Sequence, residues 1–239
     1  MWRLTMQHFW VVGTDTDVGK TAVTTLLMRQ LQRQNLRVTP YKPVQTGEVH
    51  ETDYCYYYDT AIYEKYSLQV LKQENLTGYS FKEAASPHFA AQLEAQQINV
   101  RYLLQQIQLL QQSNDIVICE GAGGLFVPLD LKSEITLLDV IVQSKLPVVL
   151  VTRTTLGTIN HTLLTIEALL TRNIDILGIV FNGDSGGLIE QDNMKTILQF
   201  HDLPYASIPQ FQEISQLVDY SISHTSLYER LVNYETSVN

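Results

Sequence analysis

The chain has 239 residues, of which 45% are hydrophobic and 17% charged, so residues 1–239 can bury the core of a single domain. Its 16 Lys+Arg and 25 Asp+Glu give a net charge of −9, which argues against a general nucleic-acid-binding surface. No apolar run reaches the roughly 18–20 residues of a membrane helix, and no signal peptide is visible. Cys55 and Cys119 show neither a disulfide framework nor metal-ligand spacing, so we expect a cytoplasmic protein without a membrane partner.

Short apolar runs alternate with longer stretches of helical periodicity. The runs predict strands over residues 8–12, 37–41, 115–119, 147–151, 176–181 and 205–208. The periodic stretches predict helices over residues 21–34, 96–114, 158–171 and 191–200, and Ser86 with Pro87 fits the start of another. Because the strands lack polar–apolar alternation, they are typical of a parallel sheet buried on both faces. We therefore predict an α/β fold with a doubly wound, mostly parallel sheet and helices on both faces.

A phosphate-binding loop follows the first predicted strand and makes the fold one of P-loop NTPase type. Residues 13–21 read GTDTDVGKT and lead into a predicted helix. In such a loop the backbone N–H groups face phosphate oxygens, Lys20 reaches the β- and γ-phosphates, and the Thr21 hydroxyl binds Mg²⁺. Five residues separate Gly13 from Gly19 where the standard motif has four, so Thr14 takes the place of the first glycine.

Other charged residues follow the predicted strands at the edge where ligands of open α/β sheets bind. Glu120 comes directly after residues 115–119, and a buried carboxylate there needs a partner such as Mg²⁺. Lys42 follows the second strand and is either a second cation for a transferring phosphoryl group or an ordinary exposed lysine. Asp53 either completes a metal shell or is a solvated loop acid. The helix start at residues 157–161 is either an anion site or a plain cap.

Six motifs, taken together, resemble the dethiobiotin synthetase family. They are GTDTDVGKT at 13–21, KPVQTG at 42–47, SPH at 86–88, EGAGG at 120–124, LGTINH at 156–161 and Asn182 after an apolar strand. The resemblance implies an ATP- and Mg²⁺-dependent ring closure, in which a diamine carboxylate (7,8-diaminononanoate) and CO₂ give dethiobiotin, ADP and phosphate. In that chemistry a carbamate forms first and is then phosphorylated to a carbamic–phosphoric mixed anhydride. The resemblance also implies a homodimer with the site at the subunit interface.

The resemblance assigns roles to individual residues, with Lys42 and Lys20 as the catalytic lysines. It implies Mg²⁺ ligation by Thr21, Asp53 and Glu120. It implies ATP contacts at Thr16, Asp17, Val18, Gly19, Lys20, Thr21, Ala22, Asp53, Glu120, Gly121, Ala122, Gly123, Asn182, Pro209, Gln210 and Phe211. It implies substrate contacts at Thr16, Thr46, Gly157, Thr158, Ile159 and Asn160.

The chain departs from the family pattern in a few places. Residues 51–60 (ETDYCYYYDT) align by spacing only, so Asp59 is an alternative to Asp53 as the metal ligand. Gly183 separates Asn182 from Asp184, where the family more often has the two side by side. Asp17 stands where Glu is common, and Met6 is an alternative to Met1 as the first residue.

Two other functions stay open at this stage. A ParA/MinD-type switch ATPase would place a lysine five residues before Lys20, where this chain has Asp15. Another P-loop amide-forming ligase, of the cobyrinate amidase kind, would usually carry an added glutaminase domain. An assay of phosphate release that requires both the diamine and bicarbonate would separate these alternatives from the ring closure.

Overall fold

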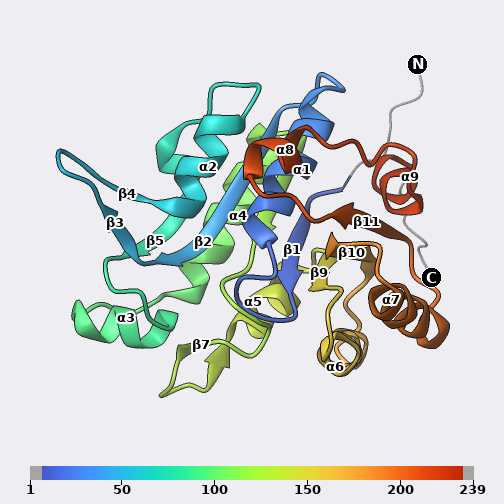
Figure 1. The fold of residues 1–239 in the computed structure, drawn as a ribbon. Coiled ribbons are helices and arrows are strands. Elements are labelled where there is room, and N and C mark those ends of the chain that lie inside the picture. The colour runs from blue at the N-terminus through green and yellow to red at the C-terminus, as the bar shows by residue number, and fades with distance from the viewer. Residues whose placement is uncertain (1–6, 234–239) are drawn as a thin grey trace.

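The computed structural model describes residues 7–233, so the choice between Met1 and Met6 lies outside the described residues. A seven-stranded sheet runs through the molecule in the order β11-β10-β9-β1-β6-β2-β5, and every pair in it is parallel (Figure 1). Its strands are β1 (Phe9–Gly13), β2 (Val38–Thr46), β5 (Thr77–Phe81), β6 (Ile116–Glu120), β9 (Val148–Arg153), β10 (Ile176–Asp184) and β11 (Tyr205–Pro209). The predicted doubly wound parallel sheet is therefore confirmed.

Helices cover both faces of this sheet, because the strands are apolar on both sides. One face packs against α1 (Lys20–Gln32), α8 (Ile214–Asp219) and α9 (Ser226–Val232). The other face packs against α3 (Pro87–Leu93), α4 (Val100–Ser113), α5 (Leu137–Ser144), α6 (Thr158–Leu170) and α7 (Leu188–Phe200). On β1, Trp10 and Val12 point to the second layer, whereas Phe9 and Val11 point to the first. Strand β1 therefore contributes side chains to both hydrophobic cores.

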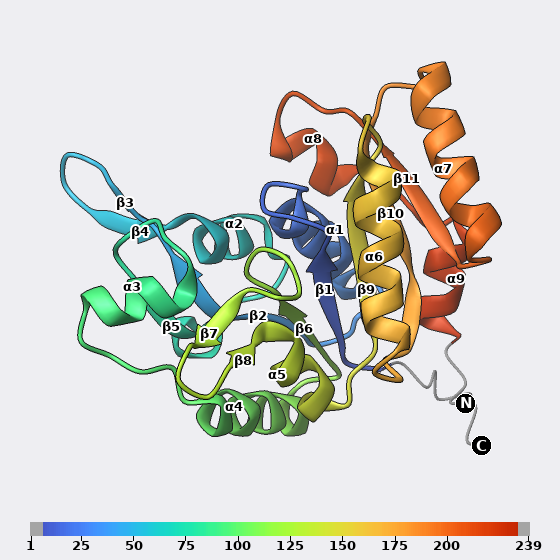
Figure 2. The ribbon, with the colours of Figure 1, turned by 90° about the horizontal axis from the view of Figure 1, so that it is seen from below.

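Several elements lie outside the sequence-based prediction. They are α2 (Tyr58–Tyr66), a 3₁₀ turn (Gln73–Asn75), the antiparallel hairpin of β3 (Glu48–His50) and β4 (Cys55–Tyr57), and the hairpin of β7 (Pro128–Asp130) and β8 (Ile135–Thr136). The prediction also missed β5, α5, α8 and α9. In both views the β3–β4 hairpin projects from the β5 end of the molecule, away from α7 and α9 (Figure 2).

Strand β2 is longer than predicted, and it changes its neighbour along its length. It pairs with β6 up to Tyr41 and with β5 from Lys42 onward. Lys42 therefore lies inside a strand rather than after one, but it is the first residue beyond the pairing with β6. Its side chain is thus placed at the carboxyl edge of the sheet, beside the phosphate loop.

The remaining predicted boundaries differ from the structure by a few residues. Helix α3 begins at Pro87 as predicted, although the Ser86 side chain makes no capping hydrogen bond. Helix α4 begins at Val100, where the Asn99 side chain accepts a hydrogen bond from the Tyr102 N–H at 3.1 Å. Within residues 7–233, no helix combines the length and hydropathy required to cross a bilayer.

Candidate active site

The phosphate loop connects the central strand β1 to α1 and is tied to β10 by a side chain. Gly19 caps α1 in the left-handed region, with φ +96°, where a side chain would be strained. A Cβ at this position would also lie 2.1 Å from Nδ2 of Asn182. Asn182 donates from that nitrogen to the Val18 carbonyl at 3.0 Å. The structure thus places the side chain of Asn182 against the phosphate loop.

Lys20 lies at the first position of α1 with its ammonium directed back over the loop. Its Nζ donates to the Asp15 carbonyl at 2.7 Å, and the side chain is buried. Burial and the neighbouring positive charge of Lys42 together lower the pKa of Lys20 to about 8, against the opposing effect of Glu120, Asp59 and Asp15. No carboxylate is hydrogen-bonded to Lys20 in the described structure, so its ammonium is well suited to bind an anionic phosphate.

Lys42 occupies a different environment, between two carboxylates. Its Nζ lies 2.6 Å from Glu120 Oε1 and 2.7 Å from Asp59 Oδ2, and it donates to the Gly121 carbonyl at 3.3 Å. Burial acts to lower the pKa of Lys42, but the two carboxylates outweigh it and raise the pKa. Burial likewise acts to raise the pKa of Asp59, and the adjacent Lys42 outweighs that effect and lowers it. Lys42 is therefore protonated and Asp59 is ionised at neutral pH.

The Thr21 hydroxyl completes a group of oxygen atoms at this point. Its Oγ1 lies 2.7 Å from Asp59 Oδ1 and 2.8 Å from Glu120 Oε1. Because a hydroxyl carries one hydrogen, it can satisfy only one of these carboxylates at a time. One hydroxyl and two carboxylates form an all-oxygen donor set, which is the chemistry that Mg²⁺ prefers. The residues present therefore fit a hard divalent cation next to the phosphate loop.

The structure replaces Asp53 with Asp59 in this group. Asp53 is exposed in the connection between β3 and β4 and does not line the cleft described below. Asp59 lies in the first turn of α2, and α2 contacts α1 and β2, which carry Thr21 and Lys42. The missed helix is the physical reason for the difference, because it turns residues 58–66 back toward the phosphate loop.

Tyr63 is a site residue that the sequence analysis did not identify. Its hydroxyl donates to Glu120 Oε2, and both side chains are buried. Burial raises the pKa of Tyr63 well above its usual value, and the Glu120 charge adds to the effect, so the phenol stays protonated. Glu120 is therefore held by Tyr63, Thr21 and Lys42 together. A spacing of four residues from Asp59 places Tyr63 on the same face of a helix, which is the signal that could have identified it.

A cleft of about 420 Å³ opens above these residues. Its lining includes Thr16, Asp17, Gly19, Lys20, Thr21, Ala22, Lys42, Thr46, Glu120, Ala122 and Gly123 among the predicted positions, and Val44, Gln45, Tyr58, Asp59 and Ile214 besides. Two predicted positions beside these residues do not line the cleft. Val18 of the loop is buried in the core, and Gly121 is buried with its N–H donating to the Val11 carbonyl at 3.0 Å. Most of the predicted phosphate and metal contacts thus meet in one cleft.

The segment 209–211 lies next to Asn182 at the end of the sheet. In the parallel pair β10–β11, Asn182 is opposite Ile208 and Asp184 is opposite Pro209. The Gln210 N–H donates to the Asp184 carbonyl at 3.0 Å, and the Phe211 ring lies 5.6 Å from that of Tyr220. The residues predicted to flank the base are therefore side by side, although Pro209 and Gln210 are exposed.

The segment 157–160 lies apart from the cleft, at the start of α6. Gly157 and Thr158 line a smaller cavity of about 80 Å³ together with Thr14 and Asp15 of the phosphate loop. The Thr158 hydroxyl donates to the Arg153 carbonyl at 2.7 Å, so this side chain is a structural part of the turn. Gly157 and Asn160 are exposed and Ile159 is half-buried. None of residues 157–160 lines the cleft that holds the Lys42 cluster.

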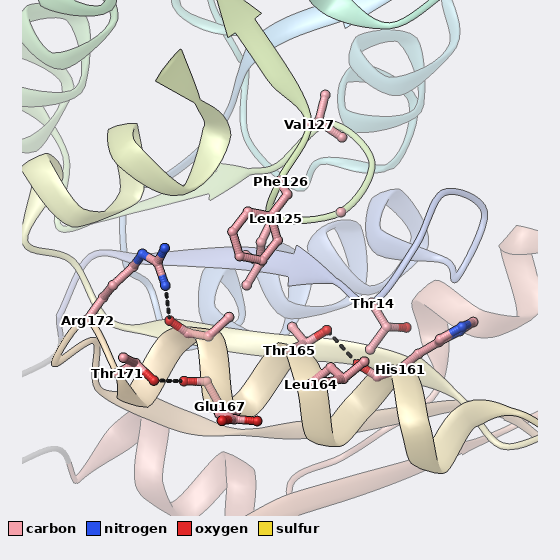
Figure 3. Close-up of a pocket in the computed structure, with 12 residues that line it drawn as sticks. Thr14, Leu125, Phe126, Val127, His161, Leu164, Thr165, Glu167, Thr171 and Arg172 are labelled. Atoms are coloured by element: carbon pink, nitrogen blue, oxygen red, sulfur yellow. Dashed lines mark hydrogen bonds between the residues drawn. The ribbon is translucent and has the colours of Figure 1, made fainter. Parts of the chain in front are cut away.

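An apolar groove adjoins that segment, between α6 and the loop after β6 (Figure 3). Its volume is about 610 Å³, and Leu125 and Phe126 of the loop lie across it from Leu164 and Thr165 of α6. Phe126 and Leu164 are 59% and 55% exposed, although both are large apolar side chains. Arg172 lies with its guanidinium carbon 5.5 Å from the Phe126 ring centre. The groove is thus a hydrophobic surface adjoining the turn at 157–160.

Known proteins resemble this chain in sequence and in fold. The family described as an AAA domain matches residues 7–217. The ATP-dependent dethiobiotin synthetase BioD of Lysinibacillus sphaericus is 71% identical over 98% of this chain and 100% of its own length. The protein of the same name from Fusobacterium nucleatum is 38% identical over 80% of this chain and 86% of its own. The septum site-determining protein MinD of Pyrococcus horikoshii, solved with Mg-ADP, has a TM-score of 0.56 at 15% identity, covering 95% of this chain and 94% of that one; it shares the fold.

Proposed function

This chain belongs to the family of ATP-dependent dethiobiotin synthetases, and from that premise we propose that it carboxylates and closes a diamine carboxylate to a cyclic urea. The substrates are 7,8-diaminononanoate, CO₂ and ATP, and the products are dethiobiotin, ADP and phosphate. The observation that carries the proposal is the meeting of Lys20 and Lys42 over one cleft, where two anions must approach each other.

Mg²⁺ is the cation we propose for the oxygen cluster, with Thr21, Asp59 and Glu120 as the residues that hold it. When bound, it neutralises charge on the β- and γ-phosphates of ATP. Asp59 takes the role predicted for Asp53. The carboxylates that now pair with Lys42 are the same ones that would face the cation. Lys42 is therefore expected to be released from them in part and to become available to the substrate.

The two lysines act on different partners in this mechanism. One amine of the substrate takes up CO₂ as a carbamate, and a carbamate oxygen attacks the γ-phosphorus while ADP leaves. Lys20 holds the phosphates, and Lys42 lies where it can offset the negative charge between the carbamate and the phosphoryl group. The second amine then attacks the carbonyl carbon of the mixed anhydride, phosphate leaves, and the ring closes.

Nucleotide contacts are proposed from the remaining cleft residues and from the end of the sheet. The backbone N–H groups of residues 16–22 would face phosphate oxygens at the start of α1. Asn182 and the segment 209–211 would contact the base, because they lie together beside the loop. Thr16 and Thr46 both line the cleft and would contact the diamine.

We propose a homodimer in which the turn at 157–160 serves the partner's site. Within one chain this turn does not line the cleft that holds the Lys42 cluster, yet its N–H groups at the start of α6 suit a carboxylate. The adjoining apolar groove and the exposed Phe126 and Leu164 offer the hydrophobic contact that a second copy would cover. Sedimentation of the purified protein tests this state, and a monomer at assay concentrations would contradict it.

The decisive test of the activity is phosphate release that depends on both the diamine and bicarbonate. With ATP and Mg²⁺ present, we expect phosphate only when both are added, and dethiobiotin in equal amount by mass spectrometry. ATP hydrolysis that ignores the diamine would instead favour a switch ATPase. The presence of Asp15, rather than lysine, five residues before Lys20 argues against that class.

A further inference from the structure

The β3–β4 hairpin places three metal-binding side chain types together, outside the cleft described above. In this antiparallel pair His50 is directly opposite Cys55, and Glu48 is opposite Tyr57. Residues two apart on a strand point to the same face, so Glu48 and His50 share a face with Cys55. The sequence showed no metal pattern here, because the three residues come together only through the pairing of the strands.

The distances within this group are short. Cys55 Sγ lies 3.0 Å from Nδ1 of His50, and Nε2 of the same ring lies 3.3 Å from Glu48 Oε2. One ligand atom from each of the three residues lies within 4.8 Å of the others. Two ligands on a tetrahedral zinc ion are about 3.3–3.6 Å apart, given metal–ligand distances of about 2.0–2.3 Å. Small side-chain rotations would bring the three atoms around a single ion.

We propose that the hairpin binds a thiophilic divalent cation of the Zn²⁺ type through Cys55 Sγ, a ring nitrogen of His50 and the Glu48 carboxylate. Sulfur and imidazole ligands select such a cation, whereas the all-oxygen cluster of Thr21, Asp59 and Glu120 suits Mg²⁺. Three protein ligands leave one tetrahedral position for water. The exposure of His50 and Cys55 gives the ion a direct path from solvent.

A cation bound here would affect the segment that connects Lys42 to Asp59. Strand β3 begins two residues after β2 ends, and β2 carries Lys42. Strand β4 leads directly into α2, whose first turn carries Asp59 four residues after Cys55. A cation that joins the two strands would therefore restrain the connection between Lys42 and Asp59. We expect slower amide exchange over residues 48–57 when it binds.

Cobalt is the probe for this site, because a thiolate bound to Co²⁺ gives an intense charge-transfer band in the near ultraviolet. The full-length, reduced protein would be titrated with Co²⁺ in an excess of Mg²⁺, which keeps the oxygen cluster occupied. We expect one equivalent to produce the band and Zn²⁺ to abolish it by displacement. Because Cys119 is fully buried, the band reports Cys55.

Matched variants separate the site from adventitious binding. Cys55→Ser should abolish the band, and His50→Gln and Glu48→Gln should weaken Co²⁺ binding at least about tenfold. Glu51→Gln on the same hairpin and His224→Gln on the exposed segment before α9 should bind as the parent does. Circular dichroism confirms folding. Absence of the band in the parent, its survival in Cys55→Ser, or equal binding by His50→Gln would overturn the proposal, whatever the outcome of the ring-closure assay.

Discussion

The two lysines of the cleft lie in opposite electrostatic surroundings. Lys20, on the phosphate loop, has a backbone carbonyl as its hydrogen-bond partner, and its pKa is lowered to about 8. Lys42, on β2, is held by two carboxylates, and its pKa is raised. Both are buried to a similar extent, with 6% and 5% of their surfaces exposed. Burial alone therefore does not decide the pKa of a lysine, because the anionic neighbours of Lys42 outweigh burial and those of Lys20 do not.

The difference assigns the two side chains different tasks. The phosphate loop offers a positive charge that lacks an anion and gains one when ATP binds. The β2–α2 region offers a positive charge whose anions are already in place, so that a cation must compete for them. In the proposed function, the first region would bind ATP, and the second would rearrange when the cation binds.

Replacement of Lys42 should have the largest effect on activity. Lys42→Met is expected to lower kcat by at least about 10²–10³-fold, because a charge aimed at the transition state is removed. ATP binding, measured by calorimetry, should stay within a few fold, since Lys20 and the loop are untouched. Lys65→Met on the exposed side of α2 is the matched control. Turnover near the parent level in Lys42→Met would show that the charge at this position is dispensable.

The carboxylate side of the comparison is tested by a pair of variants. Asp59→Asn should raise the Mg²⁺ concentration for half-maximal activity by about 10–100-fold, because one anionic oxygen is lost from the cluster. Asp53→Asn should leave it unchanged, because Asp53 is exposed on the hairpin. The reverse order of effects would restore Asp53 as the ligand and would contradict the geometry of α2.

Replacement of Tyr63 should change the Mg²⁺ requirement less than replacement of Asp59. Tyr63→Phe removes the hydroxyl that donates to Glu120 and should raise the Mg²⁺ requirement on the order of tenfold. It should also lower the free energy of unfolding by about 1–3 kcal/mol, because a buried carboxylate loses a partner. Tyr66→Phe on the same helix is the control for both. An unchanged metal dependence with reduced stability would make Tyr63 purely structural.

The smallest expected effect is the pH dependence of ATP binding. Above about pH 8 free Lys20 loses its proton, and a bound triphosphate would raise the pKa again, so binding should take up a proton. Affinity should fall by at most about tenfold per pH unit above pH 8 and stay level below it. Calorimetry in two buffers of different ionisation enthalpy measures the uptake. An ATP affinity that is independent of pH up to pH 10 would contradict the lowered pKa of Lys20.

The same shift affects the stability of the ligand-free protein. In the unfolded chain a lysine has a pKa of about 10.4, so between about pH 8 and pH 10.4 the unfolded state binds more protons than the folded state. The contribution of Lys20 to stability therefore rises with pH across this window. Lys42, whose folded-state pKa is raised, contributes stability at lower pH and loses it only as pH rises through that pKa.

The sequence was sufficient where residues near each other in the chain carry the signal. The loop at 13–21 and Glu120 at the end of β6 could be placed, because parallel strands end at one edge of the sheet. Asp59 could be offered only as an alternative, because its position depends on α2, a short helix that was not predicted. A face of Asp59, Ile62, Tyr63 and Tyr66 at helical spacing is visible in retrospect. The contact of Tyr63 with Glu120 spans 57 residues and depends on packing that no local pattern encodes.

The change of neighbouring strand along β2 affects how precisely Lys42 is positioned. The main chain of Lys42 is anchored by its N–H to the Leu76 carbonyl at 2.7 Å, on the side of β5, which is the outermost strand of the sheet. Border strands are the first to fray. The position of the ε-amino group thus depends on an edge strand that pairs with the cleft-lining part of β2, and weakening that pairing is expected to lower activity before it unfolds the protein.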